Sequence, residues 1–198
     1  MSREVFDDVD KLILEKWTEV SGLVDAYERV RDKVREQFEL VGDRLRDWGV
    51  DQDLEIRSDI KAGEFSAFQK DWLRPDKDDQ PWASLIVGGF VLEDAFGSDE
   101  SKIYAAVYCS GGKRGRHRKD AFSENLKKAV GPKVTSQWSV DTDRSCPMNL
   151  YLEGISAKSA LLDPKQFQDV VLQQFNQLSE FIEPIAASVK KMAQLPAA

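Results

Sequence analysis

The most concentrated chemistry in the sequence is a basic run from Lys113 to Lys119, which places five fixed positive charges within seven residues. Arginine binds phosphate and carboxylate oxygens in a bidentate manner, and lysine binds them as a point charge. Ser110-Gly111-Gly112 precedes the run, and a glycine turn allows backbone N–H groups to face an anion together. The sequence therefore predicts an anion-binding site made of Lys113, Arg114, Arg116, His117, Arg118 and Lys119.

The surrounding charge limits what this basic run can bind. Residues 110–133 hold eight Lys or Arg against Asp120 and Glu124, a net charge of +6 in a chain of −7, so the remainder sums to −13. Electrostatic attraction is screened beyond about 8–10 Å, which favours a local phosphate-bearing or acidic partner over general coating of DNA. The alternative, which the sequence slightly favours, is a solvated loop that offsets the acidic surface and faces Asp76, Asp78 and Asp79.

Patterns typical of enzymes are few. The sequence has no His-Glu-x-x-His, Gly-x-Ser-x-Gly or Gly-x-Gly-x-x-Gly motif. Cys109, Cys146 and the single His117 cannot assemble a Cys/His zinc site or a disulfide framework, so we expect no metal and no cofactor. Asp59-Ile60-Lys61 has the acid-x-lysine spacing of restriction-endonuclease-like nucleases without placing the chain among them, and candidate second acids are Asp53, Glu55, Asp94 and Asp99.

Aromatic residues of the central region allow a second kind of binding surface. Trp72, Trp82 and Trp138 with Phe68 could stack on nucleic-acid bases. Core packing is the favoured interpretation, because large aromatic side chains dominate cores of domains of this size. We expect partial exposure only for Trp72, which a charged segment follows.

Two long amphipathic helices flank these candidate sites. Residues 1–49 carry apolar residues at heptad spacing, from Phe6 and Ile13 to Trp48, with a weak point at Ser21-Gly22 and a stop at Gly49. Residues 163–195 form the second helix, which begins at the capping pair Asp163-Pro164 and is kinked near Pro184. The two helices pair within the chain, pair across a homodimer or cover the central sheet, and the sequence does not choose among these.

Residues 50–162 are expected to form the sheet. The ranges 82–92 and 102–109 are rich in β-branched and aromatic residues and predict an antiparallel pair joined by the polar connection 93–100. Further strands are expected at 54–57, 65–72, 134–140 and 148–152, and one short helix at 121–130. The predicted fold is α+β in one folded unit, with a mainly antiparallel sheet, one short helix and flanking helices.

Composition narrows the class of protein. A hydrophobic content of 41% over 198 residues is enough for one sizeable core. No stretch is apolar enough to span a membrane and residues 1–10 lack a signal-peptide pattern, which predicts a cytoplasmic protein without membrane contact. We expect a non-enzymatic binding or regulatory protein with an anion-facing basic loop. The alternatives are a metal-dependent phosphodiester hydrolase and a purely structural assembly protein.

Overall fold

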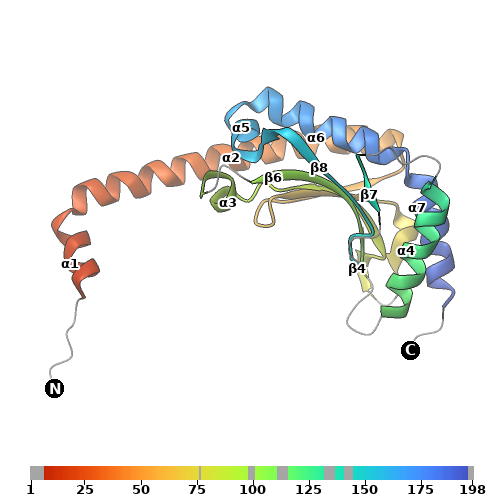
Figure 1. Ribbon diagram of the computed structural model, residues 1–198. Helices are drawn as coiled ribbons and strands as arrows, with labels where there is room; N and C mark the ends of the chain where they lie inside the picture. Colours follow the sequence, from red (N-terminus) through yellow and green to blue (C-terminus); the bar gives the residue numbers. More distant parts are fainter. Residues whose placement is uncertain are drawn as a thin grey trace, which may run out of the picture. The chain divides into compact units, whose positions relative to one another are not determined.

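The computed structural model describes residues 7–75, 77–97, 101–110, 116–131, 137–140 and 145–195. It has the α+β fold that the sequence predicts, with a six-stranded antiparallel sheet preceded and followed by helices (Figure 1). The chain divides into two compact units, Met1–Gln37 and Phe38–Ala198. Each unit is described by itself below.

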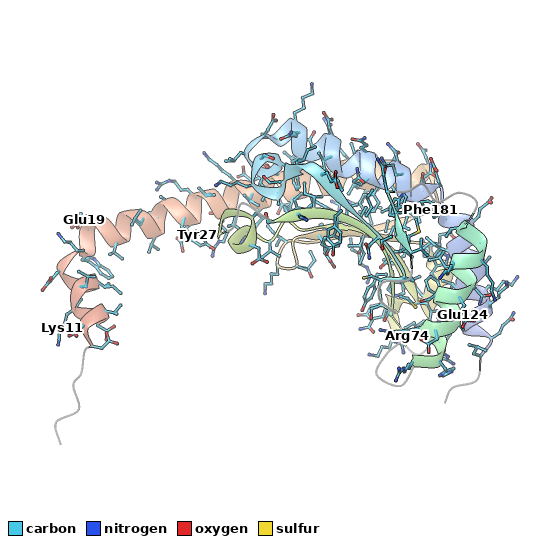
Figure 2. The ribbon with its side chains drawn as sticks, viewed as in Figure 1. Lys11, Glu19, Tyr27, Arg74, Glu124 and Phe181 are labelled. Carbon is cyan, nitrogen blue, oxygen red and sulfur yellow. The ribbon has the colours of Figure 1, made fainter. Side chains whose placement is uncertain are left out.

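The first unit contains α1 (Asp8–Glu15) and the beginning of α2 (Trp17–Asp51); Figure 2 labels Lys11 on α1 and Glu19 on α2. Asp7 caps α1, because its carboxylate accepts a hydrogen bond from the Asp10 backbone N–H at 2.8 Å. The helical run is interrupted at Lys16 and not at Ser21-Gly22, where the sequence allowed either one long helix or two collinear helices. A glycine costs only about 1 kcal/mol inside a helix, and α2 continues through it and past Gly49, the expected stop.

Replacing Gly22 by alanine should stabilise this part of α2. A Cβ atom at Gly22 meets nothing within 4 Å, so the change restores helix propensity without a clash, worth about 0.5–1 kcal/mol. Amide hydrogen exchange of residues 17–30 should slow about two- to fivefold, which corresponds to that free energy. Unchanged or faster exchange would contradict a continuous helix at this position.

The sheet has the order β1-β2-β5-β6-β8-β7, with antiparallel neighbours throughout. Its strands are β1 (Glu55–Asp59), β2 (Glu64–Phe68), β5 (Ala83–Gly88), β6 (Lys102–Cys109), β8 (Met148–Ser156) and β7 (Ser139–Val140). A separate two-stranded sheet pairs β3 (Leu73–Arg74) with β4 (Lys77–Pro81).

Two predicted strands are shorter than expected. The strand predicted at 65–72 ends at Phe68, and a short 3₁₀ helix, η1 (Lys70–Trp72), follows it. The strand predicted at 82–92 ends at Gly88, because Gly89 has φ +102° and lies against the Lys102 carbonyl. The helix α3 (Leu92–Gly97) then replaces most of the expected polar connection.

Helices cover one face of the sheet. Figure 1 shows α6 (Pro164–Ser179) lying along this face. Alternate residues of each strand point toward it, so Leu85 and Val107 are fully buried there. The Phe38, Phe65, Phe90 and Phe167 rings form one cluster, in which Phe167 lies 4.9 Å from Phe90 and 5.3 Å from Phe38.

The C-terminal part of α2 contacts α6 within the chain. The Trp48 Nε1–H donates a hydrogen bond to Asn176 Oδ1 at 2.8 Å, and the Trp48 and Phe175 ring centroids are 5.6 Å apart. Phe38 of α2 also stacks on Phe65 of β2 at 4.8 Å. This part of α2 therefore both contacts α6 and covers the sheet.

The C-terminal helical region consists of α6 and α7 (Ile182–Ala193), which Glu180 and Phe181 separate (Figure 2). Asp163 caps α6, because its carboxylate accepts from the Lys165 and Gln166 backbone N–H groups. Pro184 lies in the first turn of α7, where proline is tolerated.

Figure 1 shows α7 beside α4 (Arg116–Val130). Before α6, the short helix α5 (Ala157–Leu162) follows β8. No helix in the described ranges is both long and apolar enough to cross a bilayer.

Candidate functional site

The basic run is divided by the start of α4. The helix begins at Arg116, before the start of the helix that the sequence predicts at 121–130. Arg116 and His117 are exposed in its first turn. Lys113 and Arg114 of the predicted anion site lie outside the described residues, as does Asp76, one of the acidic residues expected opposite them.

Arg118 and Lys119 contact other parts of the protein. Arg118 Nη2 donates to the Leu195 carbonyl at 2.8 Å, and its guanidinium carbon lies 5.0 Å from the Trp82 ring centroid. Arg74, labelled in Figure 2, lies 4.7 Å from the same ring. Lys119 Nζ donates to Ser145 Oγ at 2.7 Å. Of the predicted anion-binding residues, Arg118 and Lys119 thus contact other groups of the protein, whereas Arg116 and His117 are exposed.

The acid-x-lysine triplet forms a turn. Asp59 Oδ1 accepts hydrogen bonds from the Lys61 and Ala62 backbone N–H groups, at 2.9 and 3.0 Å, between β1 and β2. Of the candidate second acids, Glu55 forms an ion pair with Lys70 at 3.7 Å, and Asp99 lies outside the described residues. The described ranges contain no group of three side chains that could hold a metal ion.

Two of the three tryptophans considered for base stacking, Trp72 and Trp82, are buried in the core. Trp72 is only 1% exposed, so the expectation of partial exposure is wrong. Trp82 is also buried, and Trp138 packs on Phe181 with ring centroids 5.5 Å apart. Core packing, the interpretation that the sequence favours, is therefore confirmed for Trp72 and Trp82.

The sheet face opposite α6 carries a groove of about 620 Å³, which we call the sheet groove. Its floor is formed by Ser66 of β2, Ile86 of β5 and Ala106 of β6, which are paired directly across the three strands. Side chains alternate between the two faces of a strand, so the neighbours of these residues in sequence fill the helix-covered core. The short side chains of Ser66 and Ala106 leave room for a ligand on either side of Ile86.

Glu64 and Tyr104 form one end of the sheet groove. They flank Gly88 in the strand register, and a Cβ atom at Gly88 would lie 2.6 Å from the Tyr104 hydroxyl oxygen. This glycine lets the Tyr104 ring cross β5 and donate a hydrogen bond to Glu64 Oε2 at 3.4 Å. Burial raises the pKa of Glu64, and burial followed by the charge of Glu64 raises the pKa of Tyr104 to about 12.

The other end of the groove is lined by Phe68, Tyr108 and the β4 residue Asp79. The Arg57 guanidinium carbon lies 4.5 Å from the Phe68 ring centroid, and Arg57 Nη1 donates to the Asp79 carbonyl. The positive charge of Arg57 is thus held at this end by an aromatic ring and a backbone oxygen. The groove therefore has an acidic end at Glu64, whereas its other end carries both the positive charge of Arg57 and the negative charge of Asp79.

The two cysteines should differ in reactivity. Neither is in a disulfide; Cys146 lines the sheet groove, and Cys109 is buried on the helix-covered side. Burial raises the pKa of the Cys109 thiol to about 12, although Lys119 acts in the opposite direction. At pH 8, iodoacetamide should therefore alkylate Cys146 and leave Cys109 intact, as peptide mass spectrometry would show. A folded Cys146→Ser variant that reacts as fast as the wild type would contradict this arrangement.

Sequence reasoning missed the sheet groove as a site. One available signal was the alternation Tyr104-x-Ala106-x-Tyr108 in a confidently predicted strand, which puts two phenols and a small residue on one face. Gly88-Gly89 was a second signal, because glycines inside a predicted strand are typical of a bulge or a close approach of the backbone. Comparison of the chain with models of known families, with curated proteins and with solved structures finds no match.

Proposed function

We propose that the protein is a non-enzymatic, cytoplasmic binding protein that holds its ligand in the sheet groove. One observation carries this proposal: the sheet face opposite α6 has a groove of about 620 Å³, whose floor at Ser66, Ile86 and Ala106 has no long side chain. Ligand sites commonly occupy about 300–1,000 Å³ and combine apolar walls with a few polar groups. The groove has both, in Phe68 and Ile86 and in Glu64, Tyr104 and Arg57.

Hydrolysis at the acid-x-lysine triplet receives less support. Asp59 accepts two backbone hydrogen bonds in the β1–β2 turn, which gives the triplet a structural role. A Mg²⁺- or Mn²⁺-dependent rise in melting temperature that Asp59→Asn abolishes would favour the hydrolase over the binding protein.

Filling the groove tests the binding proposal. Ser66→Phe places a large ring on the floor, whereas Ser139→Phe adds the same ring to an exposed position of the edge strand β7, outside the groove lining. A mixed library of neutral, cationic and anionic small molecules should give ligands, detected by NMR, that bind the wild type and Ser139→Phe but not Ser66→Phe. If no compound distinguishes the two variants, the sheet groove is not the ligand site.

Anion binding at the start of α4 is a second candidate. It is favoured by the early start of the helix, which leaves no acidic residue in the first turn and moves Asp120 one turn into the helix. The first turn of α4 thus combines backbone N–H groups with the exposed residues Arg116 and His117, a combination that suits an anion. The sequence adds the basic residues Lys113 and Arg114 to this proposed anion site.

The salt dependence of binding to a single-stranded oligonucleotide tests this second candidate. The double variant Arg114→Ala with Arg116→Ala should make the log–log slope less negative by about 1.4, since each lost phosphate contact contributes about 0.7. Lys127→Ala with Lys128→Ala removes the same charge from the last turn of α4 and should leave the slope unchanged. Equal effects of both pairs, or no binding by the wild type, would exclude a local anion site.

Self-association through the first unit is also part of the proposal. Its helices expose apolar side chains at heptad-related positions, among them Trp17, Leu23, Val24 and Val30. We expect light scattering of the intact chain to show a homodimer that Val24→Glu disrupts. A monomer throughout a concentration series would remove this part of the proposal and leave the sheet groove unaffected.

A further inference from the structure

A single row of the sheet brings carboxylates and phenol rings together. Asp59, Glu64, Gly88, Tyr104 and Tyr151 are paired in succession across β1, β2, β5, β6 and β8. The Tyr104 and Tyr151 rings meet edge to face, with centroids 6.4 Å apart and an interplanar angle of 63°. Tyr104 therefore places a phenol ring at the acidic end of the groove, with the Tyr151 ring beside it.

Glu64 has no cationic partner in the ranges that the structure describes. Its side chain is half-buried, and its hydrogen bond comes from the Tyr104 hydroxyl. Burial raises the pKa of Glu64 and nearby Asp59 raises it further, whereas the Tyr104 hydrogen bond lowers it. A cation brought to this position would supply the missing partner and favour the ionised carboxylate.

We infer that the sheet groove, in the ligand-binding role proposed for it, selects an organic cation with a primary amine or guanidinium group at Glu64. The carboxylate would accept charge-assisted hydrogen bonds from the cation, and the Tyr104 and Tyr151 rings would attract it through their π faces. An anion at the same place would face Glu64 and Asp59. This inference depends on the proposed function of the groove.

The opposite end of the groove restricts the ligand further. Arg57 is held there by Phe68 and the Asp79 carbonyl. Its guanidinium offers hydrogen-bond donors to an oxygen of the ligand, beside the negative charge of Asp79. A ligand with one cationic group and a separate carbonyl or carboxylate group matches both ends. A basic residue with its flanking peptide groups has this chemistry.

Two matched probes test the inference: Nα-acetyl-arginine N-methylamide and its citrulline counterpart, in which a neutral urea replaces the guanidinium. By isothermal titration at pH 7.5, the arginine probe should bind about tenfold more tightly, as one charge-assisted contact implies. Glu64→Gln keeps an acceptor for Tyr104 and should abolish this preference. Glu153→Gln removes an equal charge from an exposed position of β8 and should preserve it.

The outcomes separate the inference from the proposed function. If both probes bind equally and Ser66→Phe abolishes both, the groove binds ligands but the selection of a cation is wrong. If neither the probes nor any library compound responds to Ser66→Phe, the function proposed for the groove is wrong as well. Glu64→Gln weakening both probes to the same extent would also overturn cation selection.

The pH dependence of the affinity for the two probes tests the role of Glu64 on the wild-type protein. In the described ranges, the other charged or titratable groups around Glu64 and in the groove lining are Asp59, Tyr104, Arg57, Asp79, Tyr108 and Cys146. Protonation of Glu64 removes its charge, so affinity for the arginine probe should fall as the pH drops toward the pKa of Glu64, while affinity for the citrulline probe stays constant. Parallel pH profiles for the two probes would contradict the role assigned to Glu64.

Discussion

Replacing Phe167 by alanine should lower the free energy of unfolding by about 3–5 kcal/mol, because truncation of a buried phenylalanine removes apolar contacts and leaves a cavity. Phe167 is fully buried, and its ring contacts Phe38 of α2, Phe65 of β2 and Phe90. These contacts attach α6 and the C-terminal part of α2 to the sheet. The residue therefore supports the face opposite the sheet groove.

Urea unfolding followed by circular dichroism would measure this loss. The matched control is Leu162→Ala, since Leu162 precedes α6 and is 67% exposed; its effect should be within about 0.5 kcal/mol. A similar shift of the urea midpoint for the two variants would mean that the aromatic cluster does not hold α6 on the sheet.

Local sequence signals located some elements closely. The β-branched and aromatic residues at 102–109 predicted a strand with the bounds that β6 has, and Asp163-Pro164 predicted the start of α6. Both predictions succeed because the signals depend on neighbouring residues alone. The start of α4 was misplaced because the basic run was interpreted as a loop, although arginine and lysine are good helix formers. The helix α3 was missed because its acidic sequence resembles a polar connection.

The sheet groove could not be located in this way, because it depends on contacts distant in sequence. Glu64, Gly88 and Tyr104 come from three strands, and only their register shows that the phenol crosses the glycine to reach the carboxylate. A shift of one residue in any pairing would turn these side chains to the other face. By contrast, the basic run was conspicuous in the sequence, yet the structure shows Arg118 and Lys119 in contacts within the protein.

Replacing Gly63 by alanine should destabilise the protein by about 3 kcal/mol or more, since backbone strain and a steric clash act together. Gly63 has φ +60°, and a Cβ atom there would lie 2.2 Å from the Val91 backbone nitrogen. Its carbonyl accepts a hydrogen bond from the Phe90 N–H at 3.0 Å. Because the obstructing atoms are backbone, the segment at Phe90–Val91 or the β1–β2 turn must move.

Gly154→Ala separates the backbone strain expected in Gly63→Ala from the steric clash expected there. Gly154 also has a positive φ, +79°, but a Cβ atom there meets nothing within 4 Å, so its replacement should cost only about 1–2 kcal/mol for the left-handed conformation. The difference between the two variants in urea unfolding measures the close approach at Gly63. Equal losses would show that Gly63 does not lie against Phe90–Val91.

The same pair of variants connects the turn to the sheet groove. Glu64 follows Gly63 directly, so displacement of the β1–β2 turn would move the carboxylate away from the Tyr104 hydroxyl. Gly63→Ala, measured under conditions in which it is folded, should therefore lose the preference for the arginine probe over the citrulline probe, whereas Gly154→Ala should retain it. If folded Gly63→Ala kept the full preference, cation selection would not require the position of Glu64 that this turn sets.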